Sequence, residues 1–383
     1  MKENRVLRGF SIFFAIFGAA VFGLLLAAFI TNAAGLGTLL SVIGLVKAES
    51  LHDIDSKQMI EGAAAGIVEA LGDPYSRYLS KEEWQELKVQ LNAEFGGIGV
   101  YIIQREDGHL VIVSPIKGTP AERAGIKHGD IITRINGESA TRMNQDKAVQ
   151  LMRGEPGTQL ELSVLRPADG QEYHFKIIRE MINVPSVEDK MLDAEAGIAY
   201  IRLTHFSAHS SDEMRKSLEK FDKAGMKGLV LDLRDNGGGD FEAALDISNM
   251  FLDGKKEIVK VRDVRGREVV HTSTQGAYKI PVVVLVNGNS ASSSEILSGA
   301  LKDNQRAILV GEKTYGKGLV QTVYPLRGGA ALKLTTQKYF TPSGTDINEI
   351  GIVPDYVVKN PENGQKDLQL EKAIEVLKQQ MQS

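Results

Sequence analysis

Apolar and charged positions are unevenly distributed at the start of the chain. From Gly9 to Ile30 no charged side chain occurs over 22 residues. As an α-helix this run would measure roughly 33 Å, about the thickness of a hydrocarbon core. Lys2, Arg5 and Arg8 precede it. By the positive-inside rule, the pattern predicts a single-pass anchor in the cell membrane, with a cytoplasmic N-terminus and the rest of the chain outside the cytoplasm.

Two other interpretations of this run stay open. A cleaved signal peptide, which would make the protein secreted, is disfavoured because the run is longer than a usual signal core. Residues 31–33 (TNA) are also only a weak cleavage site. A buried helix of a soluble domain is disfavoured because the run is apolar on all sides.

Helical spacing of apolar residues begins after residue 55. Residues 56–70 (SKQMIEGAAAGIVEA) have this spacing, and a Gly-Asp-Pro sequence follows them. In residues 80–91 (SKEEWQELKVQL), Ser80 and Glu83 have the spacing of a capping box. We therefore expect two structural helices here.

Short apolar strands separated by glycine turns follow from Phe95, and one helical pattern, residues 144–154 (NQDKAVQLMRG), interrupts them. The order of the pieces resembles a PDZ domain: GIGV (97–100), GTPAERAGIKHGDIITRINGE (118–138), and the helix ending at Arg153. A PDZ domain binds a peptide as an added strand, while backbone N–H groups of a glycine loop take the terminal carboxylate. The resemblance implies that this loop consists of Gly97, Ile98, Gly99 and Val100.

Beyond Val184, strand patterns alternate with longer helical patterns. Strands are expected at 197–203, 228–234, 281–287 and 306–311, and helices at 210–225, 240–254 and 293–303. This alternation predicts an α/β sheet with helices packed over it. Strand patterns resume at 318–326 and 331–340.

The tail of the chain predicts an amphipathic helix. Leu370, Ile374, Leu377 and Met381 follow one another at spacings of 4, 3 and 4. Packing of this stripe in the core is favoured, and a subunit contact in a homo-oligomer stays open.

The composition of the chain excludes several kinds of site and disfavours one class of partner. With 383 residues, 43% apolar and 25% charged, the chain can form two or three globular domains. The net charge of −4, without a long run of one sign, disfavours nucleic acid as a partner. Because the chain has no cysteine, disulfides, thiolate metal sites and a cysteine nucleophile are excluded.

Two strand-to-helix turns carry candidate chemistry. DLRDNGGGD (232–240) has three glycines before a helix, which suit an anion or a developing oxyanion, although a plain tight turn explains them equally. VNGNSASSSEIL (286–297) places Ser292 and Glu295 at a helix start, first of all as a capping box. A serine at such a turn can also be an exposed nucleophile. Turns at strand ends of one sheet can meet at a crevice.

A nucleophilic serine needs a base. His205 and His209 form H-x-x-x-H, a metal-binding spacing on a helix, but this segment is typical of a strand end and has no third ligand nearby. A Ser-His-Asp triad stays open because its members need not be neighbours in sequence. Lys317 is the other candidate base. It would have to be neutral near pH 7, so burial must lower its pKa from about 10.4. A surface lysine in a turn is the plain alternative.

The loop around Lys317, GEKTYGKG (311–318), also has P-loop spacing. However, Gly318 stands where Ser or Thr would bind magnesium, and a strand pattern follows instead of a helix. The acid of GLVLD (228–232), which could pass for a metal-binding residue of a nucleotide hydrolase, precedes this loop. A nucleotide hydrolase is therefore disfavoured.

Two segments, GLVLDLRDNGGG (228–239) and VNGNSASSSEILSGALKDNQRAILVGEKTYGKGLVQ (286–321), closely resemble the C-terminal processing peptidases, also called tail-specific proteases. These are serine peptidases with a Ser/Lys catalytic pair and a PDZ domain, and the likeness covers residues 60–358. The resemblance implies Ser292 as nucleophile, Lys317 as base and Gln321 as third catalytic residue. It also implies that the backbone N–H groups of Gly238 and Ser293 form the oxyanion hole.

In a straight strand the Cα atoms of Lys317 and Gln321 would lie about 13 Å apart, so either the segment curls or Gln321 acts indirectly. Ser293 stands where family members often have Ala, and since only its N–H is required, we expect no consequence.

The expected fold is an α/β catalytic core with an inserted, mostly-β PDZ domain, an N-terminal helical segment and an N-terminal transmembrane helix. The expected segments are a cytoplasmic tail (1–8), an anchor or signal (9–31), a juxtamembrane linker (32–55), a helical segment (56–93), the PDZ domain (94–181), the Ser/Lys peptidase core (182–360) and the C-terminal helix (361–383).

The implied function is a membrane-anchored, extracytoplasmic serine endopeptidase that cleaves polypeptides with apolar C-termini engaged through the PDZ domain. Arg153, at the end of the groove helix, is a candidate regulatory residue. No metal or other cofactor is required. The alternative is a catalytically silent membrane scaffold that only binds C-terminal peptides.

Overall fold

The computed structural model describes residues 17, 21–23, 35–274, 276–361 and 366–382. Most of the predicted anchor at 9–31 lies outside these residues. In the described part, no helix is both long and apolar enough to span a membrane. The chain divides into two compact units, Met1–Tyr78 and Leu79–Ser383, with the short strand β1 (Arg77–Leu79) at the division.

The first unit contains two long stretches of described helix. Residues 35–49 are helical, although the sequence led us to expect a linker there. The helix predicted at 56–70 is α2 (Ser56–Glu69). Lys47 Nζ donates a hydrogen bond of 2.7 Å to Ser56 Oγ, which joins the end of one helix to the start of the next.

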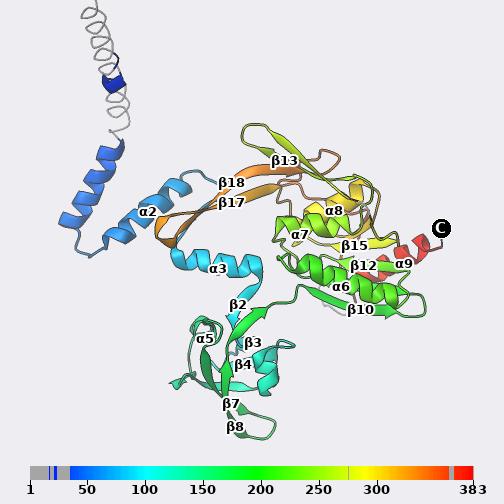
Figure 1. Cartoon of the computed structure of the whole chain (residues 1–383), viewed down its shortest axis with the longest axis horizontal. Helices are drawn as coiled ribbons and strands as arrows, with labels where there is room; N and C mark the ends of the chain where they lie inside the picture. Colours follow the sequence, from blue (N-terminus) through cyan, green and yellow to red (C-terminus); the bar gives the residue numbers. More distant parts are fainter. Residues whose placement is uncertain (1–16, 18–20, 24–34, 275, 362–365, 383) are drawn as a thin grey trace, which may run out of the picture. The chain divides into compact units, whose positions relative to one another are not determined.

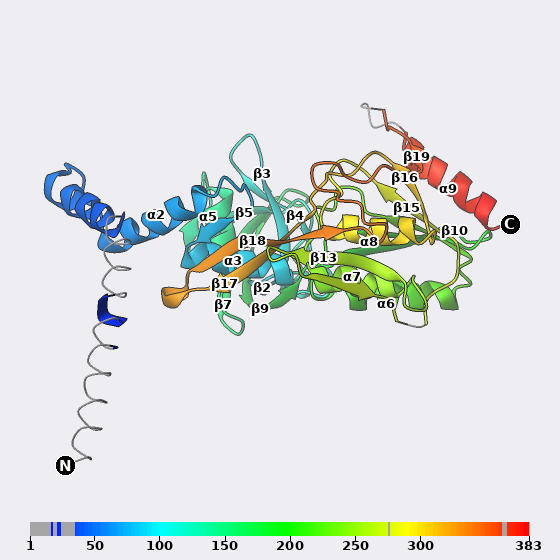
Figure 2. The same ribbon diagram turned by 90° about the horizontal axis from the view of Figure 1, so that it is seen from above.

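The predicted α/β sheet is present in the second unit (Figures 1 and 2). Its six strands run in the order β10-β11-β12-β15-β16-β19, and all neighbours are parallel except β10 and β11. Their bounds are Val187–Asp193, Ile198–Leu203, Gly228–Asp232, Val282–Val286, Ile308–Gly311 and Tyr356–Val357. Because helices cover both faces, every residue of β12 and β15 is buried.

The two faces of this sheet belong to different hydrophobic cores. Val282, Val284 and Val286 of β15 pack with α6 (Ser210–Lys223), α7 (Phe241–Asn249) and α8 (Ser293–Asp303). Val283 and Leu285 face α9 (Leu368–Gln380). Leu370, Ile374, Leu377 and Met381 all join this second core. The prediction that the C-terminal stripe packs in the core is therefore confirmed.

A second, antiparallel sheet carries the segment after Lys317. β18 (Ala331–Phe340) pairs with β17 (Leu319–Pro325) on one side and with β13 (Glu257–Asp263) on the other, and β13 pairs with β14 (Glu268–Thr272). The short 3-10 turn η1 (Arg327–Gly329) joins β17 to β18. The β13–β14 hairpin was not predicted.

The module predicted to be a PDZ domain has its own sheet and core. The strand order is β3-β4-β5-β7-β8, with β6 (Glu138–Ser139) on β5. The strand bounds are Val100–Gln104, Leu110–Pro115, Ile131–Ile135, Gln159–Arg166 and Gln171–Ile178. The helices are α4 (Pro120–Ala124) and α5 (Gln145–Met152).

The pair β2 (Glu94–Gly97) and β9 (Glu180–Asn183) lies where the chain enters and leaves this module. Before it, α3 (Lys81–Asn92) begins at the predicted capping box. Ser80 N donates to Glu83 Oε2 at 2.8 Å, and Glu83 N donates to Ser80 Oγ at 3.2 Å.

Candidate active site

The serine turn between β15 and α8 has an unusual backbone. Ser292 has φ 55° and ψ −115°, a conformation that costs a non-glycine residue about 1–3 kcal/mol unless its surroundings enforce it. Two neighbouring hydroxyls hold the turn: Ser290 Oγ donates to Leu233 O and Ser294 Oγ to Asn236 O, both at 2.8 Å. A turn of this kind presents a serine hydroxyl at the start of a helix, as in a nucleophile elbow.

The loop that follows β12, with three glycines at 237–239, is called the glycine loop here and lies directly against the serine turn. Gly238 has φ 96°, and a Cβ added there would lie 2.7 Å from Ala291 O and 2.9 Å from Ser293 N. Ser293 Oγ also donates to Gly239 O at 3.0 Å. The prediction that the two strand-end turns meet is confirmed. The Gly238 N–H, which we expected to face an oxyanion, donates here to Asn236 Oδ1 at 2.9 Å.

Glu295 joins the serine turn to residues 311–318, the segment around Lys317 that we call the lysine loop. Its side chain is completely buried. Its Oε2 accepts from the backbone N–H groups of Ser292 and Lys317, both at 2.9 Å. Its Oε1 accepts from Gly316 N at 2.8 Å and from Thr314 Oγ1 at 2.6 Å. The sequence predicted only the capping bond to Ser292, because the S-x-x-E spacing is explained by a cap alone.

The lysine loop is closely packed. A Cβ at Gly318 would lie 2.8 Å from Asn348 N, so the Gly that replaces the Ser or Thr of a P-loop has a steric reason. The loop leads into strand β17, so the P-loop alternative is wrong. Lys317 is partly buried, and this burial lowers its pKa. The positive charge of Lys333 lowers the pKa further, whereas Glu295 raises it. The net direction is the one that the sequence predicts for a base.

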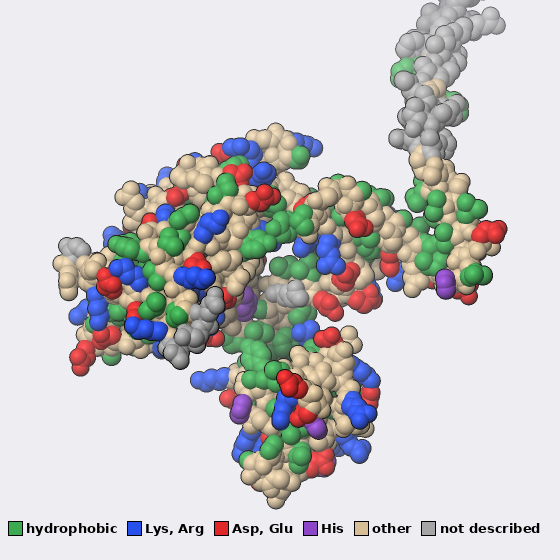
Figure 3. All heavy atoms as spheres, turned by 180° about the vertical axis from the view of Figure 1, so that it is seen from behind, with side chains coloured by type: hydrophobic (Ala, Val, Ile, Leu, Met, Phe, Trp, Pro, Cys, Tyr) green, Lys and Arg blue, Asp and Glu red, His purple; other side chains and the backbone are tan. Residues whose placement is uncertain are grey.

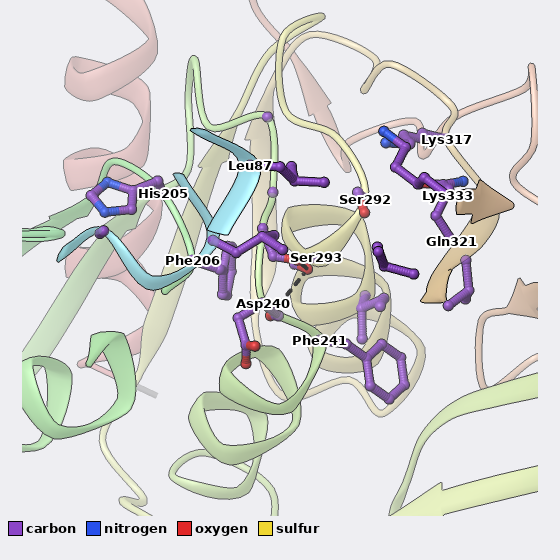
Figure 4. Close-up of a pocket in the computed structure, with 18 of the residues that line it drawn as sticks. Leu87, His205, Phe206, Asp240, Phe241, Ser292, Ser293, Lys317, Gln321 and Lys333 are labelled. Atoms are coloured by element: carbon purple, nitrogen blue, oxygen red, sulfur yellow. Dashed lines mark hydrogen bonds between the residues drawn. The ribbon is translucent and has the colours of Figure 1, made fainter. Parts of the chain in front are cut away.

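One cavity of about 650 Å³ collects the predicted residues (Figure 4). Its lining includes the predicted residues Arg153, Gly238, Ser292, Ser293, Lys317 and Gln321. Gln321 follows a bulge in β17, and its Nε2 lies 3.4 Å from both Leu319 O and Thr335 Oγ1. The segment is therefore not a straight strand. The hydrogen bonds described for the Gln321 side-chain amide stay within the β17–β18 hairpin.

A second cavity, of about 270 Å³, lies between β3 and α5. Of the expected loop, Ile98, Gly99 and Val100 line it, whereas Gly97 pairs with Glu180 of β9. Three residues, Phe95, Arg153 and Val184, line both cavities. Figure 3 shows hydrophobic side chains gathered where the β module meets the rest of the second unit.

The histidines do not form a metal site in the described part of the chain, where no group of three potential His, Cys, Asp or Glu ligands occurs. His209 Nε2 lies 2.7 Å from Glu94 Oε1. His205 lines the large cavity, its Nδ1 lies 3.0 Å from Thr204 Oγ1, and burial lowers its pKa.

Asp232, considered above as a metal-binding acid, is instead part of a buried ion-pair network. Arg234 contacts Asp232 at 2.6 Å and Asp367, the N-cap of α9, at 2.8 Å. Tyr200 also donates to Asp232 at 2.8 Å. The network connects the strand that precedes the glycine loop with the C-terminal helix, and removing one partner would leave a buried charge uncompensated.

Comparison with known proteins agrees with this geometry. Residues 197–358 match the model described as peptidase family S41, residues 111–166 match the PDZ domain, and residues 31–83 match the model described as activating protease CtpB N-terminal domain. The predicted PDZ domain is thereby confirmed.

Curated relatives carry related names. The chain is 38% identical over 318 residues to the carboxy-terminal processing protease CtpA of Bacillus subtilis, covering 83% of this chain and 67% of that protein. It is 37% identical over 334 residues to a probable CtpA-like serine protease of Staphylococcus aureus, covering 86% and 66%. It thus spans about two thirds of the length of these relatives.

A solved photosystem II D1 C-terminal processing protease aligns with a TM-score of 0.52 at 31% identity, covering 86% of this chain and 88% of that one.

Proposed function

The chain belongs to the C-terminal processing proteases of peptidase family S41, which are serine-type peptidases, and from this premise we propose that Ser292 is its nucleophile and Lys317 its general base. The observation that carries the proposal is the Glu295 carboxylate, which bonds the backbone N–H groups of both residues. This link holds the serine turn and the lysine loop at one cavity.

The proposed reaction is peptide-bond hydrolysis through an acyl-enzyme. Neutral Lys317 Nζ takes the proton of Ser292 Oγ as the oxygen attacks the peptide carbonyl carbon. The tetrahedral intermediate collapses, the C–N bond breaks, and the ammonium of Lys317 returns the proton to the leaving amine. A water molecule then attacks the acyl-enzyme with Lys317 again as base, which releases the new carboxylate and restores Ser292.

The backbone N–H groups of Gly238 and Ser293 are the proposed oxyanion donors. The Gly238 N–H is bonded to Asn236 Oδ1 at 2.9 Å, so it must leave this acceptor before it can serve the intermediate. Gln321, which lines the same cavity, is proposed as the third catalytic residue.

The PDZ domain is proposed to engage substrates by their C-termini. β3 is the last strand of its sheet, so a peptide strand can be added beside it, and Ile98, Val100 and Met152 give the adjacent groove an apolar lining. These features support polypeptides with apolar C-termini as the substrate class. Phe95, Arg153 and Val184 line both this groove and the cavity of Ser292, so the two sites are neighbours, which supports delivery of a bound chain from one to the other.

The uncharged run from Gly9 to Ile30, preceded by basic residues, supports membrane anchoring with the peptidase outside the cytoplasm. Extraction of membranes with alkaline carbonate should leave the full chain in the pellet. A chain that lacks residues 1–34 should be released into the supernatant. Release of both chains would refute the anchor.

The catalytic assignment is tested with the purified full chain on an unfolded protein and on peptides with apolar C-termini. We expect Ser292→Ala and Lys317→Ala to lower kcat about 10³-fold or more. Lys313→Ala, an exposed lysine of the same loop, should leave kcat unchanged. Because the base acts when neutral, kcat/KM should rise with pH through a pKa below 10.5. Peptide binding without cleavage by the wild type would instead favour the scaffold alternative.

A further inference from the structure

A second lysine, Lys333, faces the catalytic cavity. In the β17–β18 pairing, Val323 is opposite Lys333, and Gln321 is opposite Thr335. Paired residues of antiparallel strands place their side chains on the same face. Gln321, Val323 and Lys333 therefore share a face, and all three line the cavity. Figure 4 draws Lys317 and Lys333 on the same side of this cavity as Gln321.

Resting on the proposed function of Lys317 as general base, we propose that Lys333 is a positioning residue whose positive charge keeps Lys317 in the neutral form that can accept the Ser292 proton. A nearby like charge disfavours the charged form of an amine. Lys333 is carried by the β17–β18 hairpin and not by the loop that contains Lys317, so the two lysines reach the cavity from different segments.

Several groups surround Lys317, and they oppose one another. The Glu295 carboxylate of α8 favours the protonated lysine, although four hydrogen bonds already compensate part of its charge. Burial and Lys333 favour the neutral lysine. The Tyr339 hydroxyl of β18 donates to the Lys317 carbonyl, and Glu349 N donates to Gly316 O, with the Glu349 side chain exposed. The remaining ionisable groups that line the cavity are Arg153, His205 and Asp240.

The opposite effects of Glu295 and Lys333 on Lys317 give Lys333 a specific role. Glu295 has to lie close to Lys317 because it fixes the loop through the Lys317 backbone N–H at 2.9 Å. Its negative charge therefore accompanies its structural task and works against a neutral base. A positive charge from the neighbouring hairpin offsets that effect without disturbing the bonds of Glu295.

The test compares the pH dependence of kcat/KM in the full chain with Lys333, Lys333→Met, Lys333→Gln and the charge-preserving Lys333→Arg. We expect both neutral variants to move the midpoint of the acidic limb upward by about one pH unit. Activity on that limb should then fall about tenfold and recover on the alkaline plateau. Lys333→Arg should retain the wild-type midpoint. An equal loss at every pH, or an unmoved midpoint in both neutral variants, would overturn the proposal.

A readout that needs no cleavage separates this inference from the proposed function. In the Ser292→Ala background, the acetylation rate of Lys317 is measured against pH by competitive labelling and mass spectrometry. A higher midpoint in Lys333→Met supports the charge effect even if the wild type proves inactive on every substrate. An identical midpoint overturns it even if Ser292 proves to be the nucleophile.

Discussion

Single residues at this site have roles that their local sequence does not indicate. Glu295 is a helix cap by spacing, but its carboxylate accepts four hydrogen bonds from two segments, one at Ser292 and one over Thr314–Lys317. A buried carboxylate is stable only when its lone pairs are satisfied in this way. The strained backbone of Ser292 is thus fixed by the same group that fixes the lysine loop.

Gly238 offers a prediction at the residue scale. A Cβ at this position would come within 2.7 Å of Ala291 O and 2.8 Å of the Ser292 Cβ, and φ is 96°. Gly238→Ala should therefore displace the serine turn and the proposed oxyanion donor, and lower kcat about 10²- to 10³-fold. The matched variant is Gly288→Ala, whose Cβ meets only Lys313 O at 3.9 Å. Thermal unfolding of both variants controls for loss of folding. Equal kcat values for the two variants would contradict the steric argument.

At the scale of elements, helices and strands with a strong hydrophobic pattern were predicted correctly from the sequence. The 4-3-4 spacing of the tail gives α9, and buried apolar runs give β12 and β15. The β13–β14 hairpin was missed because β14 is almost wholly exposed, with Val269 and Val270 both at the surface, so the alternation that identifies a half-buried strand is absent.

Other element boundaries depend on tertiary contacts. The apolar stretch that follows Phe95 is divided into two strands by a break at Ile98 and Gly99, whose carbonyls accept from Ala121 N and Ile116 N, both at 2.9 Å. Gly99 has φ 77°, and its Cβ would lie 2.5 Å from Thr119. Partners that lie about 20 residues away are not visible in a local pattern. The types of residue at the candidate site could be predicted, but the bonds of Glu295 and Asn236 could not.

At the scale of the whole molecule, the proposed peptide groove and the proposed catalytic cavity share three lining residues. Arg153 ends the groove helix, lines both cavities, and its guanidinium lies 4.8 Å from the centre of the Phe95 ring, which also lines both. A cation–π contact of this kind contributes about 0.5–1 kcal/mol when exposed. That energy corresponds to a two- to fivefold effect on a rate or an equilibrium.

We therefore predict that Arg153→Ala lowers kcat/KM about two- to fivefold for a protein with an apolar C-terminus. The same variant should change little for that protein when its last residues are replaced by aspartates, because the groove is then not engaged. Arg134→Ala, an exposed arginine of β5 outside both cavities, is the matched control. Rates for Arg153→Ala equal to wild type on both substrates would show that this arginine does not couple the groove to the cavity. An equal loss on both would place its effect at the cavity alone, since only a substrate that occupies the groove can report the coupling.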